Sequence, residues 1–98
     1  MYASIRRYKT AQGKAAELAQ RVNQGFLPII SNVEGFVAYY VVDGGNDVVA
    51  SISIFQDPVA AEESNRVAAE WVKDNIASLV SGTPEIVAGA VIVHKTAK

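Results

Sequence analysis

The sequence predicts an α+β protein of βαββαβ order, a ferredoxin-like four-stranded antiparallel sheet with two helices on one face. Two strand-like segments in the middle of the chain are joined by a glycine-rich hairpin. A segment with helical periodicity lies on each side of that hairpin, and a further strand-like segment stands near each end of the chain. Right-handed crossovers between such elements lead to the split βαβ arrangement.

The first strand and helix follow from a change of period. Residues 2–8 alternate as a strand does, and residues 10–13 have the composition of a turn. From Lys14 onward apolar residues recur at helical spacing. These residues are Leu18, Val22, Phe26 and Ile29 or Ile30. Proline lacks the backbone N–H that a helix interior needs, so we expect a kink or break near Pro28.

The central hairpin is predicted from its turn residues. Residues 36–43 are rich in aromatic and β-branched side chains, which favour strands. Consecutive glycines in the segment 43–47 accept the positive φ angles of a hairpin turn. The returning strand is expected over residues 48–55, with one set of side chains at even positions and another at odd positions.

The second helix has a clear start. Asp57 can cap its N-terminus, and Pro58 suits the first helical position. The apolar periodicity predicts that this helix runs to about Val80 and ends in the turn residues 81–84. The last strand is then expected over residues 86–94.

Length and composition narrow the class of protein. Ninety-eight residues predict a single domain spanning residues 1–98. Nine basic and ten acidic residues give a net charge of −1, which leaves no electrostatic basis for nucleic-acid binding. The chain has no cysteine and no apolar run long enough to span a membrane. Charge near the N-terminus argues against a signal peptide, so we expect a cytoplasmic protein.

Two of the predicted strands indicate a partner. Residues 36–42 and 86–93 are apolar on both faces, which is typical of strands buried on both sides. Two helices can cover only one face of the sheet, and so wide an apolar patch is rarely left exposed. We therefore expect a homodimer that pairs through the open sheet face, with a monomer that tolerates exposed valines as the alternative.

Candidate ligand-binding residues come from the first predicted strand, 2–8, and from the returning strand of the hairpin, 48–55. If Ala3 and Ile5 pack under the helices, Arg6 points to the open face, and Ser51 and Ser53 follow by the same alternation. An apolar surface with a few convergent polar groups is typical of a small-ligand pocket, in which Arg6 could bind a carboxylate or phenolate. The alternative is that Arg6 pairs with a carboxylate at the dimer interface.

Four further residues have two interpretations each. Tyr39 and Tyr40 must face opposite sides of the sheet; the sequence leaves open which faces the site, and Tyr40 is the candidate ligand-binding residue. Trp71 has the helical register of a core residue or of a pocket wall. His94 and Arg6 are the candidate catalytic residues: His94, the only histidine, as a general base and Arg6 as a group that stabilises an anion. The alternative for His94 is a half-solvated residue at a strand end. One histidine without a second ligand predicts no metal site.

The chain resembles the antibiotic-biosynthesis-monooxygenase-type (ABM) domains of the dimeric α/β-barrel superfamily. The resemblance covers the whole chain and rests on structural motifs: Gly35 entering a strand at Phe36, Phe55 followed by Asp57, and the sequence Ala-Glu-Trp-Val at 69–72. It is greatest to small uncharacterised bacterial members. The superfamily includes cofactor-independent monooxygenases, haem-degrading enzymes and isomerases. Its haem-degrading members use an asparagine, a tryptophan and a helix-borne histidine, and the second helix here lacks a histidine, so the resemblance does not carry that activity.

Three functions stay open at this point. The first is binding of a small apolar or aromatic ligand without catalysis. The second is a cofactor-independent monooxygenase or isomerase acting on a small aromatic or lactone-like compound, which would stabilise an anion with Arg6. The third is a purely structural oligomerisation module. No cofactor is expected in any of them.

Overall fold

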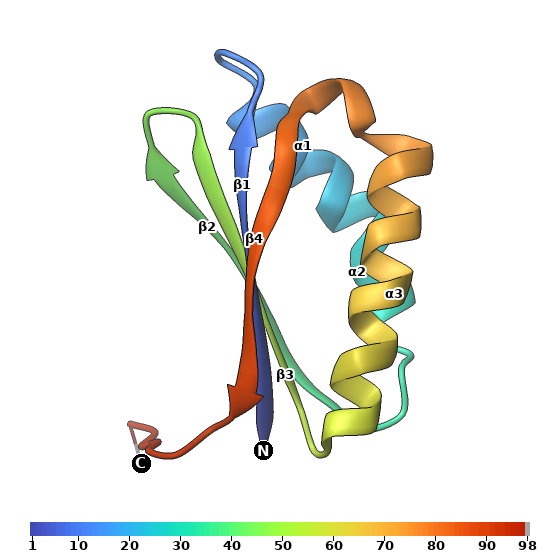
Figure 1. Ribbon diagram of the computed structural model, residues 1–98, viewed down its shortest axis with the longest axis vertical. Coiled ribbons are helices and arrows are strands. Elements are labelled where there is room, and N and C mark those ends of the chain that lie inside the picture. The colour runs from blue at the N-terminus through green and yellow to red at the C-terminus, as the bar shows by residue number, and fades with distance from the viewer. Residues whose placement is uncertain (98) are drawn as a thin grey trace.

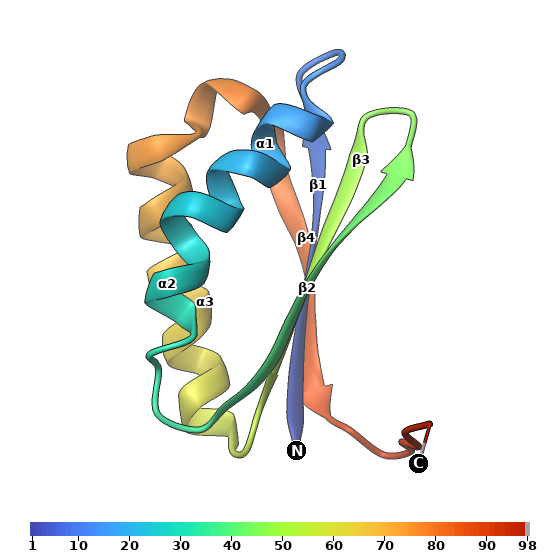
Figure 2. The same ribbon diagram turned by 180° about the vertical axis from the view of Figure 1, so that it is seen from behind.

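A computed structural model describes residues 1–97 (Figures 1 and 2). In chain order its elements are β1 (Tyr2–Thr10), α1 (Ala15–Arg21), the π-helix η1 (Val22–Phe26), α2 (Leu27–Ile30), β2 (Phe36–Gly45), β3 (Val48–Phe55), α3 (Pro58–Asn75), the 3₁₀-helix η2 (Ala77–Leu79) and β4 (Val80–Ala90). The strands form one antiparallel sheet in the order β2-β3-β1-β4. All the helices lie on one face of it (Figures 1 and 2). The predicted ferredoxin-like βαββαβ fold is confirmed.

The hairpin between β2 and β3 forms where its glycines predict it. Gly45, Asn46 and Asp47 have φ angles of 79°, 53° and 63°, which glycine and asparagine adopt at lower cost than other residues. The backbone N–H of Gly45 also donates to Asp43 Oδ1 at 3.0 Å. The returning strand then begins at Val48, as the sequence predicts.

The first helical layer, formed by α1, η1 and α2, lacks the kink or break that was expected near Pro28. The backbone stays helical past Pro28, which lies in the first turn of α2, and the irregularity is instead the π-helix η1 before it. The apolar residues of this layer are spaced by four, at Leu18, Val22, Phe26 and Ile30. In an ideal α-helix each step of four residues overshoots a full turn by about 40°. The wider π turn counteracts that drift, and all four side chains remain buried.

The second helix begins as predicted and ends earlier. Asp57 has an extended backbone, and its Oδ1 accepts a hydrogen bond from the N–H of Ala60 at 2.9 Å, so the predicted cap is confirmed. The helix α3 ends at Asn75, and the segment 81–84, expected to be a turn, lies inside β4. The predicted last strand, 86–94, therefore starts too late and ends four residues too far, because its apolar composition continues beyond the last paired residue.

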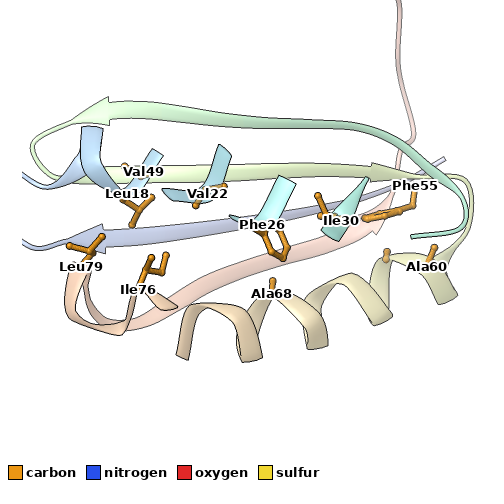
Figure 3. Close-up of a cluster of buried hydrophobic side chains, with 11 residues drawn as sticks. Leu18, Val22, Phe26, Ile30, Val49, Phe55, Ala60, Ala68, Ile76 and Leu79 are labelled. Carbon is orange, nitrogen blue, oxygen red and sulfur yellow. The ribbon is translucent and has the colours of Figure 1, made fainter. Parts of the chain in front are cut away.

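The core lies between the helices and the sheet (Figure 3). Figure 3 shows side chains of α1, η1 and α2 meeting those of β3, α3 and η2. The fully buried members include Ile30, Val49, Phe55 and Ile76. On β3 the odd positions face this core, and the even positions face away from it.

The opposite face of the sheet, here called the open face, has no covering layer in residues 1–97 (Figures 1 and 2). Strand register places Tyr40, Ile52, Ile5 and Val87 in one row across it. Ile5, Tyr40 and Val87 are 38%, 57% and 68% exposed. A single chain thus leaves an apolar surface in water, and β4, expected to be buried on both sides, is exposed on both.

Candidate functional site

Four polar residues of β1 and β3 point toward the helices. Ser4, Arg6, Ser51 and Ser53 are all buried there, whereas Ile5 is on the open face. The expectation that Ala3 and Ile5 pack under the helices is therefore wrong, and so is the placement of the serines and Arg6 on the open face. Alternation along a strand fixes which residues share a face but not which face is buried, and on β3 the buried face is the one that carries the serines.

A cavity of about 30 Å³ lies between the helices and the sheet, around the buried serines. Its walls combine many apolar side chains with a few hydroxyl, amide and guanidinium groups. They come from Arg6, Tyr8, Leu18, Val22, Phe26, Ile30, Tyr39, Val41, Val49, Ser51, Ser53, Ser64, Asn65, Ala68, Trp71, Val72 and Ile76. The cavity therefore contains four of the five predicted ligand-binding residues, Arg6, Ser51, Ser53 and Trp71, and excludes Tyr40. An apolar cavity with few convergent polar groups is the usual form of a small-molecule site.

Arg6 is the charged centre of this cavity. Only 6% of its surface is exposed. Its Nε donates to the hydroxyl of Tyr8 at 2.7 Å, and its Nη1 donates to Asn65 Oδ1 at 3.4 Å. Both acceptors are neutral. No carboxylate within the described residues pairs with it, because all ion pairs found there involve other cations.

Asn65 links the helix to the sheet. Its Oδ1 also accepts a hydrogen bond from Ser4 Oγ at 2.7 Å, so one amide oxygen holds both Ser4 and Arg6. This residue is not among those that the sequence analysis selects for the site. The signal was present, because Asn65 lies between the buried Ala61 and Ala68 at helical spacing, and a polar residue in an apolar stripe needs a polar partner.

Of the two adjacent tyrosines, Tyr39 faces the cavity. It lies opposite Ser53 on the neighbouring strand, and its ring packs edge-on against Phe26 at a centroid distance of 5.8 Å. Tyr40 lies on the open face. Burial raises the pKa of Tyr39 to about 12, against the opposing effects of Ser51 and Arg6. Tyr39 is therefore a hydrogen-bond donor at neutral pH and not a phenolate.

Trp71 forms the wall between this cavity and a second hollow. That hollow is a groove of about 230 Å³ between the α1–η1 segment and α3. It is lined by Arg21, Gln24, Gly25, Trp71, Asn75 and Ile76. The ring of Trp71 packs against Phe26, with centroids 5.5 Å apart, and lies against the backbone of Gly25. A Cβ built on Gly25 would lie 2.8 Å from Trp71 Cζ2, so the ring can occupy this position only next to a glycine.

His94 is not part of this cavity. It lies in the exposed segment after β4, which bends away from the helices toward the side of the open face (Figures 1 and 2). In residues 1–97 no three histidine or acidic side chains come close enough together to bind a metal ion. None of the helices over the same range combines the length and the apolar character needed to cross a bilayer.

Comparison with known sequences finds no matching family model and no matching curated protein. Solved structures do match over almost the whole chain. A protein of unknown function from Nitrosomonas europaea, NE2512, is 22% identical, with 99% of this chain and 94% of that chain covered and a TM-score of 0.81. A mutant of MhuD with two manganese protoporphyrin IX molecules bound per active site is 13% identical, with coverage of 98% and 99% and a TM-score of 0.76.

A third match is an uncharacterised NIPSNAP-like domain protein from Burkholderia xenovorans. It is 18% identical, with 97% of this chain and 88% of that chain covered and a TM-score of 0.69. At these identities the matches show a shared fold. Small proteins of unknown function predominate among them, beside one whose active site binds a metalloporphyrin.

Proposed function

We propose that this chain is an ABM-like protein that binds a small, largely apolar or aromatic molecule in the cavity between its helices and its sheet. The observation that carries the proposal is the wall of that cavity, in which Arg6, Asn65 and two tyrosine hydroxyls converge among apolar side chains. A fold of this size gains stability by filling such a space with its own side chains. Three neighbouring positions instead carry serines, which leaves room above the sheet.

The other two functions considered from the sequence have less support. A monooxygenase or isomerase would need a base beside the substrate, and His94 lies outside the cavity. A purely structural module needs a barrel filled by its own apolar side chains, and a buried guanidinium with neutral partners is not such a filling.

The ligand of MhuD does not transfer directly. A porphyrin is far larger than a cavity of about 30 Å³, and helix α3 contains no histidine that could bind its metal. A ligand of one aromatic ring is closer to the available space, provided that the Trp71 wall moves toward the groove behind it.

Trp71 provides the test because it is the only tryptophan of the chain and lines the cavity. Toluene, benzyl alcohol and phenylacetate should each be titrated against its fluorescence, and native mass spectrometry should be used to detect any molecule retained from the host. We expect at least one probe to give a saturable change in emission and to raise the melting temperature. If no probe does so and the protein carries the mass of its polypeptide alone, the proposed function is wrong.

A matched pair of variants shows whether the ligand is in the cavity. Ser53→Val adds bulk inside it, whereas Ala50→Val adds bulk to the same strand on the open face. Ser53→Val should weaken binding at least about tenfold, which corresponds to about 1.4 kcal/mol. Ala50→Val should leave binding unchanged, and equal effects of the two substitutions would place the ligand elsewhere.

We also propose that the protein acts as a homodimer paired through the open face. The row of Tyr40, Ile52, Ile5 and Val87 supports this, since so wide an apolar surface is rarely left in water. The segment after β4 adds to it: Ile92 and Val93 are 91% and 86% exposed, and this segment bends toward the same side as the open face. Covering both surfaces with a second copy would remove them from water together.

A further inference from the structure

The charge of Arg6 has no counter-charge. A guanidinium keeps its proton at all ordinary pH values and offers five N–H groups, of which two bind the neutral oxygens of Tyr8 and Asn65. Its Nη2 has no hydrogen-bond acceptor among residues 1–97, and the residue is only 6% exposed. Since no fully buried side-chain nitrogen or oxygen of these residues lacks a partner, Nη2 is in contact with solvent-accessible space. The cavity wall contains no aspartate or glutamate in the described part of the chain. A buried charge in this position is costly until an anion joins it.

The protein cannot supply that anion from within the cavity. The only acidic groups in its wall are the hydroxyls of Tyr8 and Tyr39. Tyr8 already accepts a hydrogen bond from Arg6, and burial raises the pKa of Tyr39 to about 12 even with Arg6 nearby. Tyr39 therefore keeps its proton at neutral pH. The cavity wall, as far as residues 1–97 form it, therefore supplies no anion for Arg6.

The surroundings define what kind of anion fits. Ser51 lies directly opposite Arg6 on the next strand, and Ser53 lies opposite Tyr39, so hydroxyl donors surround the guanidinium on the sheet side. Apart from Ser64 and Asn65, the helix side is apolar, with Phe26 and Trp71 in ring contact. One cation among neutral groups compensates one negative charge, and a dianion such as phosphate would keep an uncompensated charge in an apolar space.

Volume decides how such a molecule is oriented. About 30 Å³ holds an anionic head group, because a single water needs on the order of 10–15 Å³. The remainder of the molecule must extend past Trp71, which also lines the groove of about 230 Å³. That groove offers the faces of Trp71 and Ile76 to a flat ring, with Arg21, Gln24 and Asn75 as its polar lining.

We propose that the cavity selects organic monoanions, with a carboxylate or phenolate oxygen on the Nη groups of Arg6 and an aromatic body directed past Trp71 into the groove. This proposal rests on the proposed function and adds the chemical class of the ligand. A planar guanidinium suits a carboxylate because two parallel N–H bonds can form at once.

Benzoate and benzamide have nearly the same shape, but only benzoate is charged. Comparing their affinities therefore measures the effect of the charge alone. Both should be titrated against Trp71 fluorescence in the unmodified protein, with inorganic phosphate as a second anion. We expect benzoate to bind at least about tenfold more tightly than benzamide, because hydrogen bonds to charged groups are the stronger ones. Phosphate should give no saturable change.

Arg6→Met should reduce the preference for benzoate to about twofold or less. Arg6→Lys should retain part of the preference, because it keeps the positive charge but lacks the paired, planar N–H donors of a guanidinium. Arg7→Met is the matched control, since Arg7 lies on the open face in an exposed pair with Glu85. Without ligand, Arg6→Met should melt at or above the temperature of the unmodified protein, because it removes an unpaired buried charge.

The outcomes are distinguishable from those of the proposed function. If benzoate and benzamide bind equally well to the unmodified protein, ligand binding stands and the anion site is wrong, whether or not the Arg6 variants fold. If Arg6→Met keeps the full preference for benzoate, another group binds the anion and the role of Arg6 is wrong. If neither molecule binds, all three probes above also fail and the protein carries the mass of its polypeptide alone, the ligand-binding function itself is overturned.

Discussion

Tyr39 lies where the polar group around Arg6 meets the aromatic rings of the first helical layer. Its hydroxyl is on the sheet side near Ser51, and its ring contacts Phe26. Burial favours the uncharged hydroxyl over the phenolate, which is why its pKa rises from 10 to about 12. The same burial makes this tyrosine a source of pH-dependent stability.

The sign of that dependence follows from linkage. In the unfolded chain Tyr39 loses its proton near the ordinary tyrosine pKa of 10, and in the folded chain near 12, so the folded state binds the extra proton between these values. Stability is therefore fully present below about pH 10 and falls as the pH rises toward about 12, by about 2–3 kcal/mol for a shift of this size.

Urea unfolding at about pH 9 and about pH 11 should show this loss in the unmodified protein. Tyr39→Phe should lose less stability over the same interval, because the titrating group is gone. Tyr40→Phe removes an exposed tyrosine of the adjacent position and should behave as the unmodified protein does. Equal pH dependence in all three proteins would mean that the hydroxyl of Tyr39 is not buried.

The π-helix η1 is the element that shapes the groove side of the site. It contributes Phe26 to the cavity and Gly25 to the groove, with Trp71 of α3 between them. Gly25 does not have a positive φ, so its role there is to leave space for the Trp71 ring. A side chain at this position would have to displace that ring.

Gly25→Ala tests this packing. Alanine favours a helix over glycine by about 1 kcal/mol, but its Cβ would meet Trp71 Cζ2 at 2.8 Å. We expect the fluorescence and near-ultraviolet dichroism of Trp71 to change, and the helix-propensity gain to be cancelled or reversed in urea unfolding. Asn23→Ala lies in the same element on its exposed side and should gain a few tenths of a kcal/mol.

A double-mutant cycle isolates the contact. In a Trp71→Phe background the atom that Gly25→Ala would strike is absent, so the substitution should become stabilising by up to about 1 kcal/mol. The contact is disproved if Gly25→Ala has the same effect in both backgrounds and leaves the Trp71 spectrum unchanged.

At the level of elements, much could be predicted from the sequence. The Asp57 cap and the glycine-rich hairpin are local signals, determined by backbone conformation over a few residues, and both are confirmed. The π turn could not be predicted, because the spacing of its apolar residues fits an α-helix nearly as well. The end of β4 could not be located either, because apolar composition continues through Val93 after strand pairing has ended.

The candidate site shows a different limit of prediction from the sequence. Arg6, Ser51, Ser53 and Trp71 reach one cavity, although the wrong sheet face was expected for the first three. Both faces of this sheet carry apolar residues, so alternation could not show which of them the helices cover. Asn65 has a local signal, its place between the buried Ala61 and Ala68, but its partners Ser4 and Arg6 are 61 and 59 residues away in the chain. The side on which Tyr39 lies depends on the pairing of β2 with β3, which has no trace in local spacing.

At the scale of the whole molecule, the unusual feature is that an apolar row crosses the uncovered face of the sheet. Ile5, Ile52 and Val87 occupy it, while serines and an arginine occupy the covered face. This distribution is unfavourable for a monomer and favourable for a dimer, since a second open face would bury the apolar row and leave both cavities intact. The cavity and the proposed interface are thus on opposite sides of one sheet.

A single charge on each side of the molecule tests the dimer. Val87, on the open face, is 68% exposed, and Val59, near the start of α3, is 73% exposed. In a monomer, glutamate at either position should change stability by no more than about 0.5 kcal/mol, as surface substitutions usually do. In a dimer paired through the open face, Val87→Glu would bury an unpaired carboxylate in each copy, which is costly enough to separate the subunits.

Sedimentation equilibrium at micromolar concentration should therefore give a dimer for the unmodified protein and for Val59→Glu, and a monomer or unfolded chain for Val87→Glu. An unmodified protein that is monomeric and soluble at this concentration, or a Val87→Glu variant that remains fully dimeric, would show that the open face is not the interface.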